Sequence, residues 1–182
     1  MPTPPIVVMG VSGCGKSTVG AALAAALHVD FEDGDDLHPP SNVAKMAAGQ
    51  PLDDADRAPW LDAVGTWLGE HRSGGVIACS ALKRTYRDVL RAHATDAAFL
   101  YLDCDADLIE QRVSHRPGHF MPASLVASQL ATLEPLQPDE AGAAISGNLP
   151  VDAIVGCFLT ALDDVVLKKR AAGAEPNARP SP

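Results

Sequence analysis

The segment GVSGCGKST, residues 10–18, places three glycines before a lysine and two hydroxyl side chains. It fits the pattern GxxxxGK[ST], in which glycines let the backbone turn so tightly that its N–H groups point at phosphate oxygens. In such a loop Lys16 can reach the β- and γ-phosphates, and the Ser17 hydroxyl can bind Mg²⁺. We therefore predict a loop that binds the phosphates of a nucleotide. The predicted contacts are Gly10, Val11, Ser12, Gly13, Cys14, Gly15, Lys16, Ser17 and Thr18.

Acidic residues form a second group, in which Asp33 and Asp35 alternate just after the predicted strand at residues 29–31. Ligands of doubly wound sheets bind at the carboxyl ends of the strands. One carboxylate there could hold hydrated Mg²⁺, and the other could accept the proton of an attacking hydroxyl during phosphoryl transfer. The alternative is a solvated acidic turn. The phosphate loop nearby favours the functional interpretation.

Strands that alternate with helices must position these groups. Residues 6–9 are short and apolar and predict a buried strand, and residues 17–27 predict a helix, so the phosphate loop has the strand-before, helix-after context that its pattern requires. Further strands are predicted at 29–31, 76–79, 98–102 and 143–146, and further helices at 53–68, 83–91, 105–115, 122–133 and around 154–166, with a short helical stretch beginning at Lys45. This alternation predicts an α/β domain with a parallel sheet. We expect one domain over residues 1–170 and a disordered tail at 171–182.

Composition limits the partners that we expect. The chain has 182 residues and a formal net charge of −9, which argues against broad nucleic-acid binding. Its four cysteines form no CxxC pair, so we expect reduced thiols. No secretion signal and no membrane-spanning stretch is evident in the sequence. We therefore expect a cytoplasmic protein that binds neither nucleic acid nor membrane.

The phosphate loop alone fits several classes of protein: a small-molecule kinase, a nucleotide kinase, a GTPase switch or a mechanical ATPase. No [NT]KxD pattern for reading guanine follows a late strand, and the chain is short for a motor domain. The aromatic content of 4% offers few groups to stack on a second base. A small-molecule kinase is thus favoured, and a shikimate-like or nucleoside monophosphate kinase and a non-catalytic ATP-binding regulator are the alternatives.

Longer segments narrow the choice further. They are residues 10–17, 33–39 (DGDDLHP), 42–49 (NVAKMAAG), 51–61 (PLDDADRAPWL), 79–87 (CSALKRTYR) and 118–121 (GHFM). Together these segments resemble the bacterial-type gluconokinases, which are similar in fold to shikimate and nucleoside monophosphate kinases. The resemblance covers roughly residues 6–168.

The resemblance implies transfer of the ATP γ-phosphate to the 6-hydroxyl of D-gluconate, which gives 6-phosphogluconate. It also implies a three-layer P-loop fold, with a five-stranded parallel sheet of order 2-3-1-4-5 between helices and a helical lid at about residues 114–135. It is compatible with a homodimer.

The resemblance assigns the chemical roles as well. Asp35 would lie nearest the acceptor hydroxyl, and Asp33 would act on Mg²⁺ through water, together with Ser17. Lys16 would be catalytic. Arg57 would grip the carboxylate of gluconate, because a guanidinium can bind it bidentately. The alternative for Arg57 is a surface charge paired with one of the neighbouring aspartates, Asp53 or Asp54.

Small and polar residues complete the predicted acceptor site. His38 could bond a sugar hydroxyl or be structural, and Lys45 could contact substrate or be a surface lysine. Small side chains at Ser80 and Ala81 would let substrate approach the backbone. The final pair of candidates, either attracting gluconate or simply solvated, is Lys83 and Arg87.

The lid supplies the remaining predicted residues. Arg116 would close over the transferring phosphoryl group as a catalytic residue, and Arg112 would lie near the phosphates or the adenine. The alternative for both is a surface arginine paired with Asp107 or Glu110. His119 and Gln129 are predicted to bond substrate, and Gln129 could also be an ordinary polar helix residue.

Overall fold

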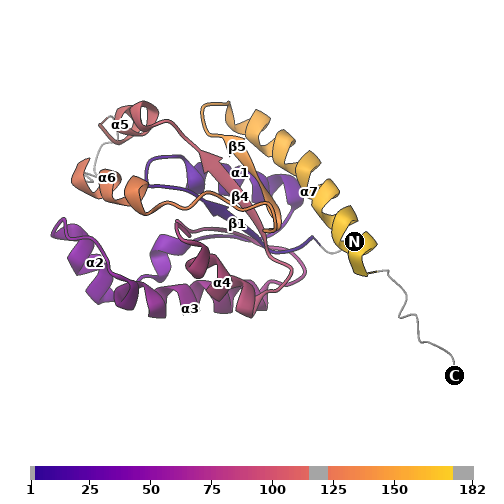
Figure 1. Ribbon diagram of the computed structural model, residues 1–182, viewed down its shortest axis with the longest axis horizontal. Helices are drawn as coiled ribbons and strands as arrows, with labels where there is room; N and C mark the ends of the chain where they lie inside the picture. Colours follow the sequence, from indigo (N-terminus) through magenta and orange to yellow (C-terminus); the bar gives the residue numbers. More distant parts are fainter. Residues whose placement is uncertain (1–2, 115–122, 174–182) are drawn as a thin grey trace, which may run out of the picture.

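A parallel sheet forms the centre of the molecule, with helices on both faces (Figure 1). The computed structural model describes residues 3–114 and 123–173. The strand order β2-β3-β1-β4-β5 confirms the predicted five-stranded fold. The strands are β1 (Ile6–Met9), β2 (Phe31–Asp33), β3 (Val76–Ala78), β4 (Ala98–Asp103) and β5 (Gly142–Ser146). Because β1 lies at the centre, the phosphate loop that follows it emerges in the middle of the carboxyl edge.

Helices connect the strands near the predicted positions. They are α1 (Lys16–Leu27), α2 (Pro40–Ala47), α3 (Asp54–Glu70), α4 (Arg84–His93), α5 (Ala106–Ser114), α6 (Ala123–Thr132) and α7 (Val151–Gly173), with a 3₁₀ turn η1 (Gly34–Leu37). Lys45 lies in the last turn of α2 and does not begin it, because Pro40 starts that helix. α7 includes residues 171–173, which were expected in the tail. None of the helices in the described ranges is long and apolar enough to cross a bilayer.

β2 begins two residues later than predicted. Phe31 pairs with Val76, and Asp33 pairs with Ala78 in the parallel ladder. Two of the three strand residues are acidic, and β2 forms one edge of the sheet. Local propensity therefore disfavours a strand here, and pairing with β3 decides the outcome.

Alternate residues of β1 pack into two hydrophobic clusters. Ile6 and Val8 face one cluster, to which α1 and α7 contribute, and Val7 and Met9 face the other, beneath α3 and α4. All four side chains are fully buried, as expected for the central strand of a parallel sheet. The sheet is thus fixed from both sides, which gives the loops at its carboxyl edge a rigid base.

A buried ion pair links α4 to the segment before β5. Arg87 and Glu140 are both buried, and their side chains bond at 2.8 Å. Arg91 also bonds Glu140, at 2.6 Å. Burial alone would raise the pKa of Glu140, but these hydrogen bonds lower it to about 2.

The pair makes stability depend on pH. A carboxyl whose pKa is lowered on folding stabilises the fold above its ordinary value of 4.5, and this contribution is lost as the pH falls toward about 2. We expect Glu140→Gln to be less stable than wild type near neutral pH by about 3 kcal/mol, with the gap narrowing as the pH falls below about 4.5. Urea unfolding at several pH values measures this. A gap that stays constant on acidification would contradict it. Asp139→Asn is the matched control: the hydrogen bond from Arg84 also lowers the pKa of Asp139 to about 2, but solvent screens this exposed pair, so the loss of stability should be much smaller.

Candidate active site

The phosphate loop takes the conformation that its glycines allow. Gly10, Gly13 and Gly15 have φ angles of 141°, 84° and 96°, in the region that favours glycine. The Lys16 ammonium folds back over the loop and donates to the carbonyl oxygen of Val11 at 3.2 Å. The loop therefore combines a tightly turned backbone with the positive charge of Lys16, as a phosphate site requires.

The electrostatics of Cys14 report the same positive environment. A hydrogen bond from Cys104 lowers the pKa of the Cys14 thiol against the effect of burial, and the charges of Lys16 and Arg112 lower it further. Cys104 also lies against the loop, with its Sγ 3.7 Å from the Cys14 carbonyl oxygen. The loop thus favours negative charge at its centre.

The acidic turn after β2 meets the phosphate loop directly. The Ser17 hydroxyl donates to Oδ2 of Asp33 at 2.5 Å, and Oδ1 of Asp33 accepts the backbone N–H of Asp35 at 3.1 Å. The Ser17 hydroxyl and the Asp33 carboxylate, both predicted to act on Mg²⁺, therefore lie next to each other. The Asp35 side chain is 73% exposed, so its carboxylate is accessible at this edge.

Close packing fixes the acidic turn against β3 and α3. A Cβ added to Gly34 would lie 2.4 Å from the carbonyl oxygen of Ala78, so only glycine fits there. Trp60 donates its indole N–H to the Gly34 carbonyl at 2.7 Å. Burial raises the pKa of nearby Cys79 to about 12, and the charges that act on this thiol include those of Asp35, Lys16 and Asp33. The phosphate loop and the acidic turn therefore both act electrostatically on the residue that follows β3.

His38 and Lys45 support this arrangement through protein contacts. The His38 side chain is 4% exposed and stacks on Trp60 at 4.2 Å, and its Nε2 lies 4.0 Å from Asp35. Burial lowers the pKa of His38, and the nearby carboxylate of Asp35 partly offsets this. Lys45 pairs with Asp56 at 2.7 Å, which joins α2 to α3. Both side chains thus have structural partners, and substrate contacts by them remain predictions.

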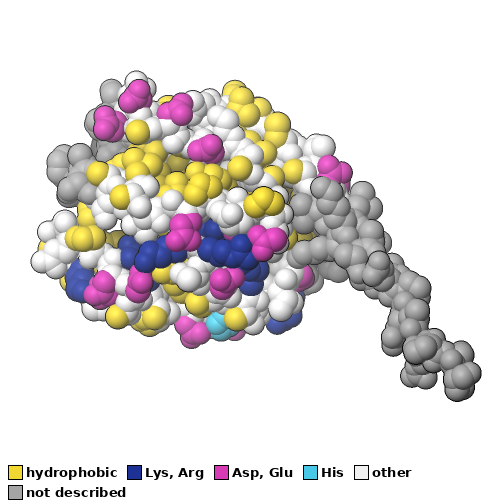
Figure 2. Space-filling view, in the orientation of Figure 1, with side chains coloured by type: hydrophobic (Ala, Val, Ile, Leu, Met, Phe, Trp, Pro, Cys, Tyr) yellow, Lys and Arg dark blue, Asp and Glu magenta, His cyan; other side chains and the backbone are white. Residues whose placement is uncertain are grey.

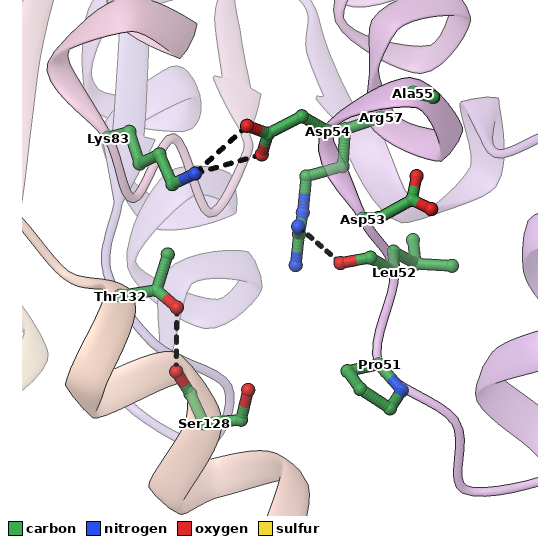
Figure 3. Close-up of a pocket in the computed structure, with 9 residues that line it drawn as sticks. All are labelled: Pro51, Leu52, Asp53, Asp54, Ala55, Arg57, Lys83, Ser128 and Thr132. Carbon is green, nitrogen blue, oxygen red and sulfur yellow. Dashed lines mark hydrogen bonds and ion pairs between the residues drawn. The ribbon is translucent and has the colours of Figure 1, made fainter.

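A groove of about 630 Å³ lies between the start of α3, the start of α4 and α6 (Figure 3). Its lining residues are Pro51, Leu52, Asp53, Asp54, Ala55, Arg57, Lys83, Ser128 and Thr132. The guanidinium of Arg57 points into it and donates to the Leu52 carbonyl, and it lies 3.4 Å from the Tyr86 hydroxyl. Lys83, the residue just before α4, also lines it and bonds Asp54 at 2.9 and 3.1 Å.

The charges of the groove are unequally paired. Asp54 is taken by Lys83 and by the Tyr86 hydroxyl, and among the described residues no ion pair joins Arg57 to Asp53 or Asp54. The predicted ion pair of Arg57 with these aspartates is therefore not found in the described chain, although the charge of Arg57 does act on Asp54. The hydrogen bond from Tyr86, followed by that from Lys83, lowers the pKa of Asp54. Arg57 thus presents a positive charge whose described bonds go to neutral oxygens.

Tyr86 and Asp54 were not predicted as site residues. The signal for them lay in two segments that carried the resemblance, 79–87 and 51–61, where Tyr86 follows Lys83 by three positions at a helix start. Lys83 also lies 5.3 Å from the centre of the Tyr86 ring, in a cation–π contact. The hydrogen bond from Tyr86 to Asp54 joins residues 32 positions apart, so spacing along the chain does not reveal it.

Arg87 corrects a prediction. Both the solvated interpretation and a direct contact with gluconate require an accessible side chain, but Arg87 is completely buried. Its donors are occupied by Glu140 and by main-chain carbonyls. Ala81 is also fully buried, with a φ of 44°, and the Ser80 carbonyl accepts the N–H of Gly10 at 3.2 Å.

Side chains from α5 and α6 hold the phosphate loop from the other side. Arg112 donates to the carbonyl oxygens of Cys14 and Gly147, each at 3.0 Å. The Gln129 side chain accepts the N–H of Ser12 at 2.7 Å and donates to its hydroxyl at 3.2 Å. Arg112 therefore lies beside the loop, in the region where it was predicted. Gln129 braces the loop, and Arg116 and His119 lie outside the described residues.

Comparison with known proteins gives consistent matches. A family model described as shikimate kinase matches residues 12–134. The gluconokinase of Gluconobacter oxydans is 50% identical over 153 residues, which cover 82% of this chain and 86% of that protein. The thermoresistant gluconokinase of Escherichia coli is 43% identical, with coverage of 82% and 87%.

Solved structures agree with these matches. The crystal structure of a gluconokinase from Sinorhizobium meliloti has a TM-score of 0.86 and 43% identity, and the match covers 96% of this chain and 99% of that one. The APS kinase of Mycobacterium tuberculosis has a TM-score of 0.62 at 18% identity over 89% of this chain and 98% of that one, a likeness that shows the shared fold.

Proposed function

The chain belongs to the gluconokinase family, and on this premise we propose that it transfers the γ-phosphoryl group of ATP to the 6-hydroxyl of D-gluconate. The products are 6-phosphogluconate and ADP. The observation that carries this proposal is the hydrogen bond between Ser17 and Asp33, because it places the acidic turn against the phosphate loop. Phosphoryl transfer depends mainly on such positioning and on charge compensation.

ATP and Mg²⁺ fit the residues present. The backbone of residues 10–15 and the ammonium of Lys16 would hold the phosphates. The Ser17 hydroxyl and the Asp33 carboxylate are oxygen ligands of the kind that Mg²⁺ prefers, and few of them are needed because water and phosphates supply the rest. The metal, when bound, neutralises charge on the β- and γ-phosphates.

Asp35 is the group that we assign to the acceptor. Its carboxylate is exposed at the sheet edge, and its backbone bond to Asp33 fixes the turn on which it lies. From there it would orient the 6-hydroxyl of gluconate and take up its proton as the oxygen attacks phosphorus. Trp60 and Gly34 keep the turn rigid, so that the position of Asp35 is set before substrate binds.

The acid end of gluconate would bind in the groove. Arg57 points into this groove with neutral partners in the described chain, and a guanidinium can bind a carboxylate with two parallel charge-assisted hydrogen bonds. Lys83 adds a second positive charge, balanced by Asp54. The hydroxyls of Ser128 and Thr132 on α6 line the opposite side and could bond the polyol chain.

Several assignments stay predictions. They are the roles of Arg116 and His119 in the lid, a role of Arg112 toward the nucleotide, a homodimer and a cytoplasmic location.

An ADP-release assay with a panel of acceptors tests the function. We expect turnover with gluconate, weaker turnover with other aldonates, and none above background with shikimate or a nucleoside monophosphate. ATP binding without turnover on any acceptor would favour a regulator, and preference for shikimate or a nucleotide would favour the alternative kinases.

Arg57→Met should weaken gluconate binding in particular. Loss of a charge-assisted bond is expected to raise the KM for gluconate about 10- to 100-fold, while the KM for ATP stays near wild type. Steady-state kinetics with each substrate varied in turn measure this. Arg72→Met, an exposed arginine that bonds the His93 carbonyl, is the matched control. An unchanged gluconate KM in Arg57→Met would place the carboxylate elsewhere.

A further inference from the structure

Arg87 lies in the first turn of α4, and its buried guanidinium reaches both the turn just before this helix and a segment distant in sequence. Its Nε and one terminal nitrogen bond the two oxygens of Glu140, both at 2.8 Å. The other terminal nitrogen donates to the carbonyl oxygens of Ala81 at 3.1 Å and Glu134 at 3.0 Å, with Leu82 at 3.4 Å. The side chain thus ties α4 to the turn after β3 and to the segment between α6 and β5.

The turn after β3, residues 80–83, lies between the phosphate loop and the groove. Its first residue, Ser80, accepts the N–H of Gly10 at 3.2 Å, and its last residue, Lys83, faces the groove. Between them Ala81 has a φ of 44°, a left-handed conformation that residues with a Cβ avoid. A turn in this conformation needs support from its surroundings.

Arg87 supplies that support. It donates to the consecutive carbonyls of Ala81 and Leu82, and the Leu82 carbonyl also accepts the N–H of Glu134 at 2.8 Å. Glu140 orients the guanidinium from the opposite side and balances its charge. Both side chains of the ion pair are fully buried, so this contact is shielded from solvent.

We propose that the Arg87–Glu140 pair is a positioning element of the active site. It holds residues 80–83 in their left-handed turn, which sets the Ser80 carbonyl against the phosphate loop and Lys83 at the groove, without contact to substrate. The inference rests on the proposed function only for the name of the acceptor.

The guanidinium fork is essential to this role. The planar guanidinium has N–H donors that point in different directions, so one side chain can bond Glu140 and the carbonyls of the turn at the same time. A lysine keeps the positive charge for Glu140, but its donors lie on one nitrogen and cannot reach both sets of acceptors. Arg87→Lys therefore separates the charge of the buried pair from the support of the turn.

Hydrogen exchange and kinetics test the proposal on the full chain. In Arg87→Lys we expect faster exchange at the amides of Gly10 and Glu134, whose acceptors are Ser80 and Leu82, and no change at Ile6 in the central strand. We expect kcat with gluconate to fall about 10-fold while ATP affinity stays within about twofold of wild type. Glu140→Gln should lower kcat in the same way, and because it also lowers the global stability of the fold, its exchange at Ile6 should rise as well.

Arg84→Met is the matched control. Arg84 pairs with Asp139 at 2.6 Å and so also joins α4 to the segment before β5, but this pair is exposed. Figure 2 shows that one face of the molecule carries a band of Lys and Arg side chains interleaved with acids. Exchange and kcat in this variant should match wild type. Unchanged exchange at Gly10 and Glu134 in Arg87→Lys, or exchange raised equally at Ile6, would overturn the positioning role. A wild-type protein without gluconate turnover would overturn only the proposed function, because the exchange result is read independently.

Discussion

Replacement of Lys16 by alanine is expected to lower kcat about a thousandfold or more. The lysine follows Gly15 at the start of α1, and its ammonium lies over the phosphate loop, 3.2 Å from the Val11 carbonyl. From this position it would compensate negative charge that moves onto the β–γ bridge as the γ-phosphoryl group leaves. Lys16 is the one Lys or Arg in residues 10–18, so alanine at this position leaves the negative charge on the bridging oxygen largely unbalanced.

The measurement for Lys16→Ala is single-turnover kinetics at saturating ATP and gluconate, with thermal unfolding of the same samples. The one described bond of the Lys16 ammonium is to a carbonyl in its own loop, so the unfolding temperature should change little. A folded variant that keeps more than about a tenth of wild-type kcat would show that Lys16 does not stabilise the transition state.

Asp35→Asn is expected to lower kcat about a hundred- to ten-thousandfold, the range typical of a general base, while ATP affinity changes little. The asparagine side chain is the same size, and the bond that fixes the turn uses the backbone N–H of Asp35, which the substitution keeps. The loss would therefore reflect the missing proton acceptor. The exposed neighbour Asp36, in the same 3₁₀ turn, gives the matched control Asp36→Asn, which should behave like wild type.

Rapid-quench measurement of the chemical step, with ATP affinity measured separately, distinguishes these effects. If Asp35→Asn kept the wild-type rate, the acceptor hydroxyl would have to lie away from the acidic turn. If Asp35→Asn and Asp36→Asn lowered the rate of the chemical step equally, the cause would instead be the lost negative charge of the turn as a whole.

The sequence predicted the sheet and the contact between its two loops well, for a physical reason. The phosphate loop and the acidic turn both follow strands of a parallel sheet, so their place at one edge follows from the order of elements alone. The contact of Ser17 with Asp33 needs only that β2 and β1 lie on either side of β3. Local patterns predicted that both loops lie at this edge, and the strand order that places β2 and β1 on either side of β3 came from the resemblance.

Contacts between distant segments were beyond such patterns. Arg87 lies four positions after Lys83 near the start of a helix rich in charged residues, and this suggested a second surface cation. Its burial is decided by Glu140, 53 positions later, on a segment whose position only the packed structure defines. Likewise Gln129 meets Ser12 across 117 positions, which no spacing within α6 indicates.

The most direct test of the central claim is to identify the product after incubation with ATP, Mg²⁺ and D-gluconate, by proton-coupled phosphorus NMR. A phosphomonoester whose signal is split by the methylene protons of C6, formed together with ADP and absent in Lys16→Ala, is the result expected. ADP formation that does not depend on gluconate, or a phosphate attached to a secondary carbon, would contradict the account.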